Sequence, residues 1–322
     1  MLGAGILWFL YKGENMDEIK QVLDSGIRWP WIVLSFVFAV LSHVARAYRW
    51  QQQLRTLDCK ASLNTLSNSV FGNYGVNLIF PRLGEVWRCN YIARREQMSF
   101  SVVLGSVVSE RIFDVLCIGI ISAATILIQI PFFASFFSEH ETLAGSLSTL
   151  FLTPWLYLGL AVVVLVGWLC RKRVMQWRLT QKIVEFAKKL LEGIKTIQGL
   201  PNKWFFIFLT FGIWFLYFLN FYVCLFAFEC TENVSLLGGL TCFVMGSLGI
   251  IVPVQGGTGP WHFMIISTLV LLGIGQTEAS TFALVVHALQ QVFVILLGLY
   301  AVAAIQIDNR SVVRNAAATS ES

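Results

Sequence analysis

The sequence predicts an all-α polytopic membrane protein, and its composition, its apolar runs and its charge distribution lead to this fold class. Of the 322 residues, 57% are hydrophobic and only 13% are charged, with a mean hydropathy of +0.71. Soluble domains carry about 25% charged residues. Apolar runs that approach the roughly 20 residues of a membrane helix recur along the chain. Such a chain cannot fold as a water-soluble globule.

We expect about six full spans. Most of them correspond to long apolar runs, at residues 31–45, 102–130, 155–170, 204–228 and 282–305. The apolar run Leu2–Tyr11 is only half a span long, and we interpret it as the end of a first span. It lacks the basic region and the small-residue cleavage site of a signal peptide.

Two further apolar stretches, Leu63–Phe80 and Val234–Leu272, are interrupted by Gly, Asn and Pro. Irregular backbone at membrane depth is tolerated only inside protein or beside a cavity. We therefore expect two oppositely oriented re-entrant helical hairpins, the first open to the cytoplasm and the second to the outside. With this topology and a cytoplasmic C-terminus, most of the 23 Lys and Arg residues lie inside, in agreement with the positive-inside rule.

The two broken stretches belong to an internal repeat. In the first copy, Gly72–Gly75 is followed by Pro81–Trp87; in the second, Gly246–Gly249 is followed by Pro253–Trp261. A long span with polar residues at its centre comes next in each copy. Because the copies enter from opposite sides, we expect an inverted repeat with its substrate site near the bilayer midplane.

The whole chain, residues 1–322, is expected to form one membrane domain. Its parts are a first repeat at about 30–130, a cytoplasmic linker at 171–203, a second repeat at about 204–306 and a disordered tail at 309–322. Apolar residues recur at helical spacing in the basic linker, which is typical of an amphipathic helix on an anionic leaflet. An ordinary basic connection fits the positive-inside rule equally well.

Charged residues inside a span are the first candidates for a site. Glu110, Arg111 and Asp114 follow about nine residues of their span, which places them about 14 Å into a core roughly 30 Å thick. An unpaired charge at that depth costs about 3 kcal/mol, so these side chains should face protein or a wet cavity. They form either a substrate site or a buried ion-pair network. His43 and Arg46, near the end of their span, are interpreted as snorkelling or packing groups.

Polar residues near the breaks extend the candidate site. Glu85 and Arg88 lie one helical turn apart, and a guanidinium binds phosphate bidentately, although both also fit as interfacial charges at a helix start. His287, Gln290 and Gln291 reach a depth comparable to that of the charged trio. We predict that one of the two glutamines approaches the trio, while hydrogen bonding between spans explains these residues equally well.

The glycine-rich segment after Pro253 lacks the lysine of a nucleotide-binding P-loop. We expect a flexible break at which the amides of Gly256, Gly257 and Gly259 face a cavity. His262 follows this break and has no His or carboxylate at ligand spacing. The sequence therefore predicts no metal, no cofactor and no nucleic-acid partner.

These motifs together resemble a known family. Arg82–Arg88 forms R-x-G-E-x-x-R, Glu110–Asp114 forms E-R-x-x-D, and Gly256–Gly259 carries the glycines. The chain is similar to the lysylphosphatidylglycerol synthase transmembrane family over nearly its whole length. In the best-understood relatives this region is the flippase part of the multiple peptide resistance factor, which translocates aminoacylated phosphatidylglycerol. A soluble aminoacyl transferase domain follows there, whereas this sequence ends at Ser322, so the resemblance implies translocation and not aminoacylation.

The resemblance implies that Arg82, Glu85, Arg88, Glu110, Arg111, Asp114, Gly256, Gly257 and Gly259 bind substrate. Many relatives have an acidic residue after the glycines, where this chain has Pro260-Trp261-His262. An aminoacyl-lipid ammonium would favour that acid, so we expect a different anionic phospholipid or a polyprenyl-phosphate lipid.

The function expected from the sequence is lipid translocation across the bacterial inner membrane, without enzymatic activity. One alternative is an intramembrane enzyme that acts on a lipid phosphate or glycolipid, with Glu110 and Asp114 as acid and base. Another is a non-catalytic membrane partner of envelope-lipid synthesis. A homodimer is compatible with the sequence.

Overall fold

The computed structural model describes residues 26–80, 83–140, 195–252 and 254–320, with scattered positions between 20 and 24 and between 145 and 192. These residues form helices and no strand, which confirms the all-α class. Three predicted features lie outside the described residues: the span end at 2–11, the span at 155–170 and Arg82. Most of the linker at 171–203 also lies outside them. Two of its described residues, Glu185 and Lys189, form an i,i+4 ion pair that holds the pKa of Glu185 below its ordinary value.

Four long apolar helices among the described residues are able to cross a membrane by length and composition. They are α3 (Trp29–Arg55), α6 (Phe100–Ile128), α11 (Lys203–Leu225) and α14 (Gln276–Ser320), of which the apolar part ends at Asp308. Each of these helices contains a predicted apolar run or overlaps one to within a few residues at its ends. The chain is therefore a multi-pass membrane protein, while the count of six spans stays a prediction.

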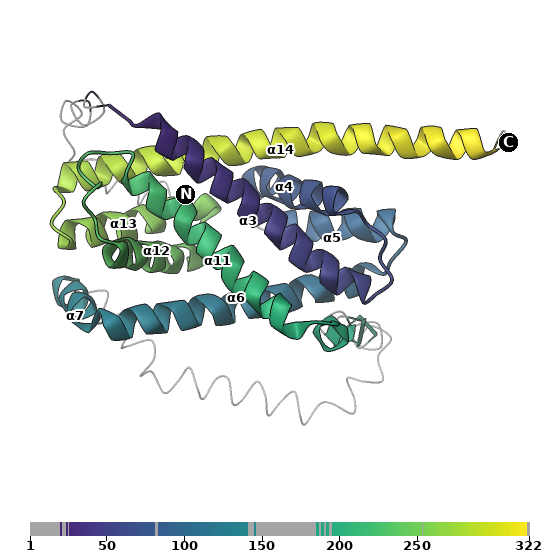
Figure 1. Ribbon diagram of the computed structural model, residues 1–322, viewed down its shortest axis with the longest axis horizontal. Helices are drawn as coiled ribbons and strands as arrows, with labels where there is room; N and C mark the ends of the chain where they lie inside the picture. Colours follow the sequence, from purple (N-terminus) through teal and green to yellow (C-terminus); the bar gives the residue numbers. More distant parts are fainter. Residues whose placement is uncertain are drawn as a thin grey trace.

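Helices α3 and α11 lie side by side and run in opposite directions (Figure 1). Side-chain hydrogen bonds hold them together at two levels. Asn220 on α11 donates to the carbonyl oxygen of Ser35 at 2.7 Å, and Arg49 on α3 donates to the Thr210 hydroxyl at 2.9 Å. Because polar groups in an apolar surrounding need partners, these bonds help to fix the register of the two helices.

Each broken stretch forms a pair of short helices. The first pair is α4 (Leu63–Ile79) and α5 (Gly84–Arg95), and the second is α12 (Leu236–Ile251) and α13 (Pro260–Leu271). At 1.5 Å per residue even α4 is only about 25 Å long, shorter than a hydrocarbon core of about 30 Å. The pairs fit the predicted hairpins, and their re-entrance into a bilayer stays a prediction.

The two halves repeat one order of elements: a long helix, two short helices and a second long helix. Ser62 and Ser235 cap the first short helix of each half by accepting a backbone hydrogen bond at 3.1 Å. Helices α6 and α14 run in opposite directions (Figure 1). This arrangement supports the internal repeat that the sequence predicts, whereas its inverted orientation in a membrane is untested.

The halves exchange packing partners, because α4 contacts α14 of the other half and α12 contacts α6. At the α4–α14 crossing, Gly75 faces Gly298 so closely that a Cβ on Gly298 would lie 2.8 Å from the Gly75 Cα atom. The backbones meet there without side chains between them. Small residues permit such close approach of membrane helices.

Smaller elements complete the fold. Helix α7 (Ile130–Glu139) follows α6 and packs Phe133 and Phe136 against Met245 of α12. Two short 3₁₀ helices, η1 (Lys195–Gly199) and η2 (Gln255–Gly257), precede α11 and α13. Helix α14 continues to Ser320, and the disorder predicted for the tail from residue 309 stays a prediction. No Gly or Pro follows Gly298 to end that helix.

We predict that Gly298→Ala destabilises the protein, because the added methyl group must displace the backbone of α4. The expected loss is about 1–3 kcal/mol, measured as a lower midpoint of thermal unfolding in detergent. Gly212→Ala on α11 is the matched control, since nothing lies within 4 Å of a Cβ at that position. An equal loss in both variants would contradict the crossing.

The topology predicts that the α3–α4 loop and the α11–α12 loop lie on opposite membrane faces. Figure 1 places these loops at opposite ends of the molecule. In a Cys230→Ser background, Lys60→Cys should react with an impermeant maleimide only from the cytoplasmic side, and Asn233→Cys only from the outer side. Both positions are exposed. Labelling of both from one side would show that the topology is wrong.

Candidate functional site

A cavity of about 480 Å³ lies between the two halves, within the range of about 300–1,000 Å³ typical of small-molecule sites. Residues from both halves line it. The first half contributes Phe36, His43, Arg46, Asn73, Asn77, Glu85 and Arg111, and the second contributes Trp214, Tyr217, Asn220, Gly256, Trp261, His287, Gln290, Gln291 and Phe293, among others. The cavity therefore has charged groups on the first half and neutral polar and aromatic groups on the second.

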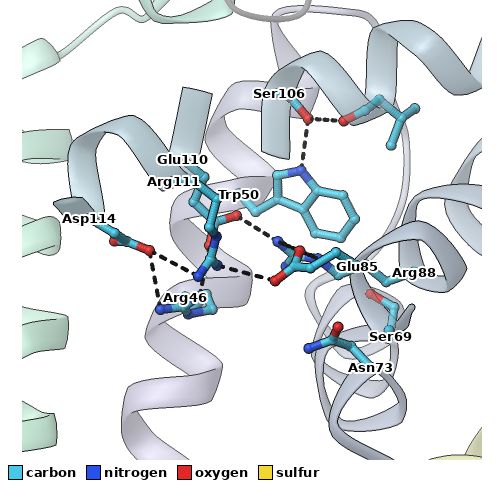
Figure 2. A network of polar contacts seen from close by, with 12 residues as sticks. Arg46, Trp50, Ser69, Asn73, Glu85, Arg88, Ser106, Glu110, Arg111 and Asp114 are labelled. Carbon is cyan, nitrogen blue, oxygen red and sulfur yellow. Dashed lines mark hydrogen bonds and ion pairs between the residues drawn. The ribbon is translucent and has the colours of Figure 1, made fainter. Parts of the chain in front are cut away.

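The charged groups belong to a cluster of four arginines and three carboxylates, and Figure 2 labels all of them except Arg49. We call it the arginine cluster, and its members are Arg46, Arg49, Glu85, Arg88, Glu110, Arg111 and Asp114. Glu110 lies at its centre with no exposed surface. Its carboxylate oxygens lie 2.8–3.4 Å from a guanidinium nitrogen of each of the four arginines.

The other two carboxylates are shared as well. Asp114 lies 2.8 Å from Arg49, 3.3 Å from Arg46 and 3.4 Å from Arg111. Glu85 lies 2.7 Å from Arg88 and 3.6 Å from Arg111. Buried charges are tolerated when they are paired and hydrogen-bonded, and each of the four arginines pairs with at least two carboxylates.

Helical spacing explains how three helices supply this cluster. Arg46 and Arg49 are i,i+3 on α3, Glu85 and Arg88 are i,i+3 on α5, and the predicted trio lies on α6. Trp50 supports the cluster from α3, where its ring lies 4.7 Å from the Arg88 guanidinium carbon and its indole N–H donates to Ser106 at 2.9 Å. The indole thereby fixes the position of Arg88.

The structure corrects the interpretation of Arg46 as a snorkelling group. It is buried, and it pairs with Glu110 and Asp114. Helix α3 continues to Arg55, beyond the apolar run, so Arg46 lies inside the helix bundle and not at a helix end. Arg49 was not predicted as a site residue, because it also follows the apolar run. The i,i+3 spacing of Arg46 and Arg49 was the sequence feature that could have predicted two arginines on one face of the helix.

Arg88 and Arg111 differ in access to the cavity. The Arg88 side chain is 1% exposed and is absent from the cavity wall, whereas that of Arg111 is 39% exposed and lines it. The buried Nε atom of Arg111 has no hydrogen-bond partner within the described part of the chain. Of the two arginines that line the cavity, Arg111 is therefore the more exposed, since the Arg46 side chain is only 7% exposed.

The second half presents imidazoles and amides where the first half presents ions. The ring centroids of His262 and His287 are 4.5 Å apart, and a ring nitrogen of His287 lies 2.9 Å from the Gly256 carbonyl oxygen. Gln291 lies 3.3 Å from the same nitrogen. Gln290 and Gln291 line the same cavity as Arg111, and no hydrogen bond joins either of them to the arginine cluster among the described residues.

The glycine break adopts the backbone conformation that requires glycine. Gly256, Gly257 and Gly259 have φ values of 63°, 71° and 97°, in the left-handed region that side chains disfavour. The Gly259 N–H donates to Nδ1 of His262 at 3.4 Å. The break thus turns the chain sharply between α12 and α13 and presents the Gly256 carbonyl to His287. Among the described residues, no group of three or more His, Cys, Asp or Glu is arranged to hold a metal ion.

Comparison with models of known protein families gives a match over most of the chain. The model of the lysylphosphatidylglycerol synthase TM region matches residues 1–298. This chain belongs to that family. No curated protein and no solved structure shows a match to it. The family assignment confirms the resemblance inferred from the motifs and identifies the chain as a membrane-protein domain of the lysylphosphatidylglycerol synthase type.

We predict that Arg49→Gln destabilises this family member by about 3–5 kcal/mol, because it strands buried carboxylates. Arg28→Gln is the control. Arg28 pairs with Glu232 at the surface with half of its side chain exposed, and such pairs contribute about 0–1 kcal/mol. Thermal unfolding in detergent measures both.

The double variant Arg49→Gln/Asp114→Asn should lose less free energy of unfolding than the sum of the losses in its two single variants. Strict additivity of the two losses would argue against coupling between these residues.

Proposed function

We propose that this protein translocates an anionic phospholipid or lipid-linked headgroup across the bilayer through the cavity between its halves. The observation that carries the proposal is that one cavity joins the arginine cluster of the first half to the glycine break of the second. Transporters built from repeats bind substrate at such an interface, where broken helices meet. Family membership supports the same reading.

The charge of the cluster favours an anion. Its four arginines outnumber its three carboxylates by one. An uncompensated positive charge is costly at low dielectric, so a phosphate that enters the cavity would complete the charge balance. Arg111 is the natural contact, because it lines the cavity with 39% of its side chain exposed and a guanidinium matches phosphate geometry.

Arg88 has a different role in this proposal. The sequence suggested that it contacts phosphate, but its side chain is 1% exposed and does not line the cavity. We assign it a positioning role. It holds Glu85 and Glu110, and these two carboxylates in turn hold Arg111 at the edge of the cavity.

Acid–base catalysis fits this site less well. Glu110 and Asp114 each lie within 4 Å of three or more arginines, and neither lines the cavity in which a substrate would bind. We therefore propose transport without chemical change, in a bacterial inner membrane with the C-terminus in the cytoplasm. A homodimer remains compatible with this proposal.

Lipid redistribution in reconstituted vesicles tests the function. Fluorescent phosphatidylglycerol should move between leaflets faster in vesicles that contain the protein, without chemical modification. Arg111→Lys should slow this movement about tenfold, because it retains the charge but loses the bidentate fork. Arg94→Lys is the control at an exposed position. Wild-type rates in a folded Arg111→Lys protein, or a chemically altered lipid, would contradict the proposal.

A further inference from the structure

We infer that the headgroup bound in this cavity is uncharged and hydroxylated, is joined to its lipid through a phosphodiester, and carries no ammonium group. The inference rests on the proposed function and names the substrate class of the same cavity. Phosphatidylglycerol and polyprenyl-phosphate sugars share this chemistry.

The first step is that no carboxylate is left for an ammonium. Arg46, Glu85 and Arg111 are the lining residues with a fixed charge among the described part of the chain. Glu85, the one acid among them, is already engaged by Arg88 and Arg111. A headgroup ammonium would meet two guanidinium groups and would have to displace an arginine. Like charges placed opposite each other are strongly unfavourable at an interface.

The second step is that neutral amides remain open to the cavity. Asn73 is 4% exposed and lines the cavity, and its amide nitrogen has no hydrogen-bond partner among the described residues. Asn220 uses its nitrogen to bind Ser35, which leaves its carbonyl oxygen free. The Gln290 side chain, which also lines the cavity, makes no hydrogen bond among the described residues. Amides offer both donors and acceptors, which is what hydroxyl groups require.

The third step is that apolar ring faces accompany these amides. Phe36 and Phe293 are stacked in the cavity wall, with ring centroids 4.4 Å apart and planes within 3°. Aromatic walls with a few placed polar groups are typical of small-molecule sites, and ring faces pack against the C–H face of a sugar or glycerol. An aromatic cage also attracts cations, but here the neighbouring arginines oppose a second positive charge.

Together these steps place the phosphate beside Arg111 on α6 and the hydroxylated headgroup toward Gln290 on α14. Both side chains line the same cavity from opposite halves. Recognition then separates into two contributions: the guanidinium selects the phosphate, and the amides select what is attached to it.

Equilibrium binding to the purified full chain tests this inference by microscale thermophoresis. Short-chain phosphatidylglycerol and a short polyprenyl phosphoglucose are the hydroxylated ligands. Phosphatidylethanolamine and lysyl-phosphatidylglycerol of the same chain length carry an ammonium. At least one hydroxylated ligand should bind about tenfold tighter than both ammonium ligands. Tighter binding of only one hydroxylated ligand supports the inference and shows whether the lipid that carries the headgroup is a glycerolipid or a polyprenyl lipid.

Two substitutions at one position sharpen the test. Gln290→Leu should weaken binding of the preferred ligand about three- to tenfold. Gln290→Glu should shift the preference toward the ammonium ligands by a similar factor. Gln306→Leu and Gln306→Glu are matched controls, because Gln306 is exposed on the same helix and lies outside the cavity. The Gln306 variants should leave every affinity unchanged.

Several results would overturn the inference: equal or tighter binding of an ammonium ligand, no binding of any ligand, or no shift in a folded Gln290→Glu protein. The vesicle experiment distinguishes a failure of this inference from a failure of the proposed translocation. Redistribution of lipid combined with ammonium preference leaves translocation standing and removes this inference. Hydroxyl-selective binding without redistribution supports the inference and removes translocation.

Discussion

The buried carboxylate of Glu110 is the group on which the rest of the structure depends. It contacts guanidinium groups from α3, α5 and α6, and its desolvation is tolerable only while those contacts persist. The first short-helix pair is thereby attached to two long helices by charge as well as by packing. The same contacts hold Arg111 at the cavity edge, so the stability of the first half and the proposed recognition of an anion depend on one set of residues.

The two halves share an order of helices but differ in electrostatics. Trp87 of the first half and Trp261 of the second each cover a glycine of the preceding short helix, Gly72 or Gly246. The residue after each tryptophan is buried, but it is Arg88 in one half and His262 in the other. The cavity lining shows the same difference, because its charged residues, Arg46, Glu85 and Arg111, all belong to the first half.

Hydropathy was enough to locate the long helices that are described, because each apolar run is continuous and membrane spans have a narrow range of lengths. The interruptions by Gly and Pro located the short pairs. The charge of Glu110, Arg111 and Asp114 implied burial, but the sequence does not show which cations lie opposite them. Arg46 and Arg49 are more than sixty residues away from these partners along the chain, and they follow the apolar run, which made them resemble interfacial groups. Pairing between helices is a property of packing that a single sequence does not contain.

The Gly75–Gly298 contact is the point at which α14 could change its angle relative to α4. Where two backbones meet without side chains, no interlocking ridges resist a change of crossing angle. Gln290 lies eight residues before Gly298 on α14, about 12 Å along the axis, so a tilt of about 10° at this point displaces it by about 2 Å. A change in the crossing angle of α4 and α14 would therefore move Gln290 and change the width of the cavity.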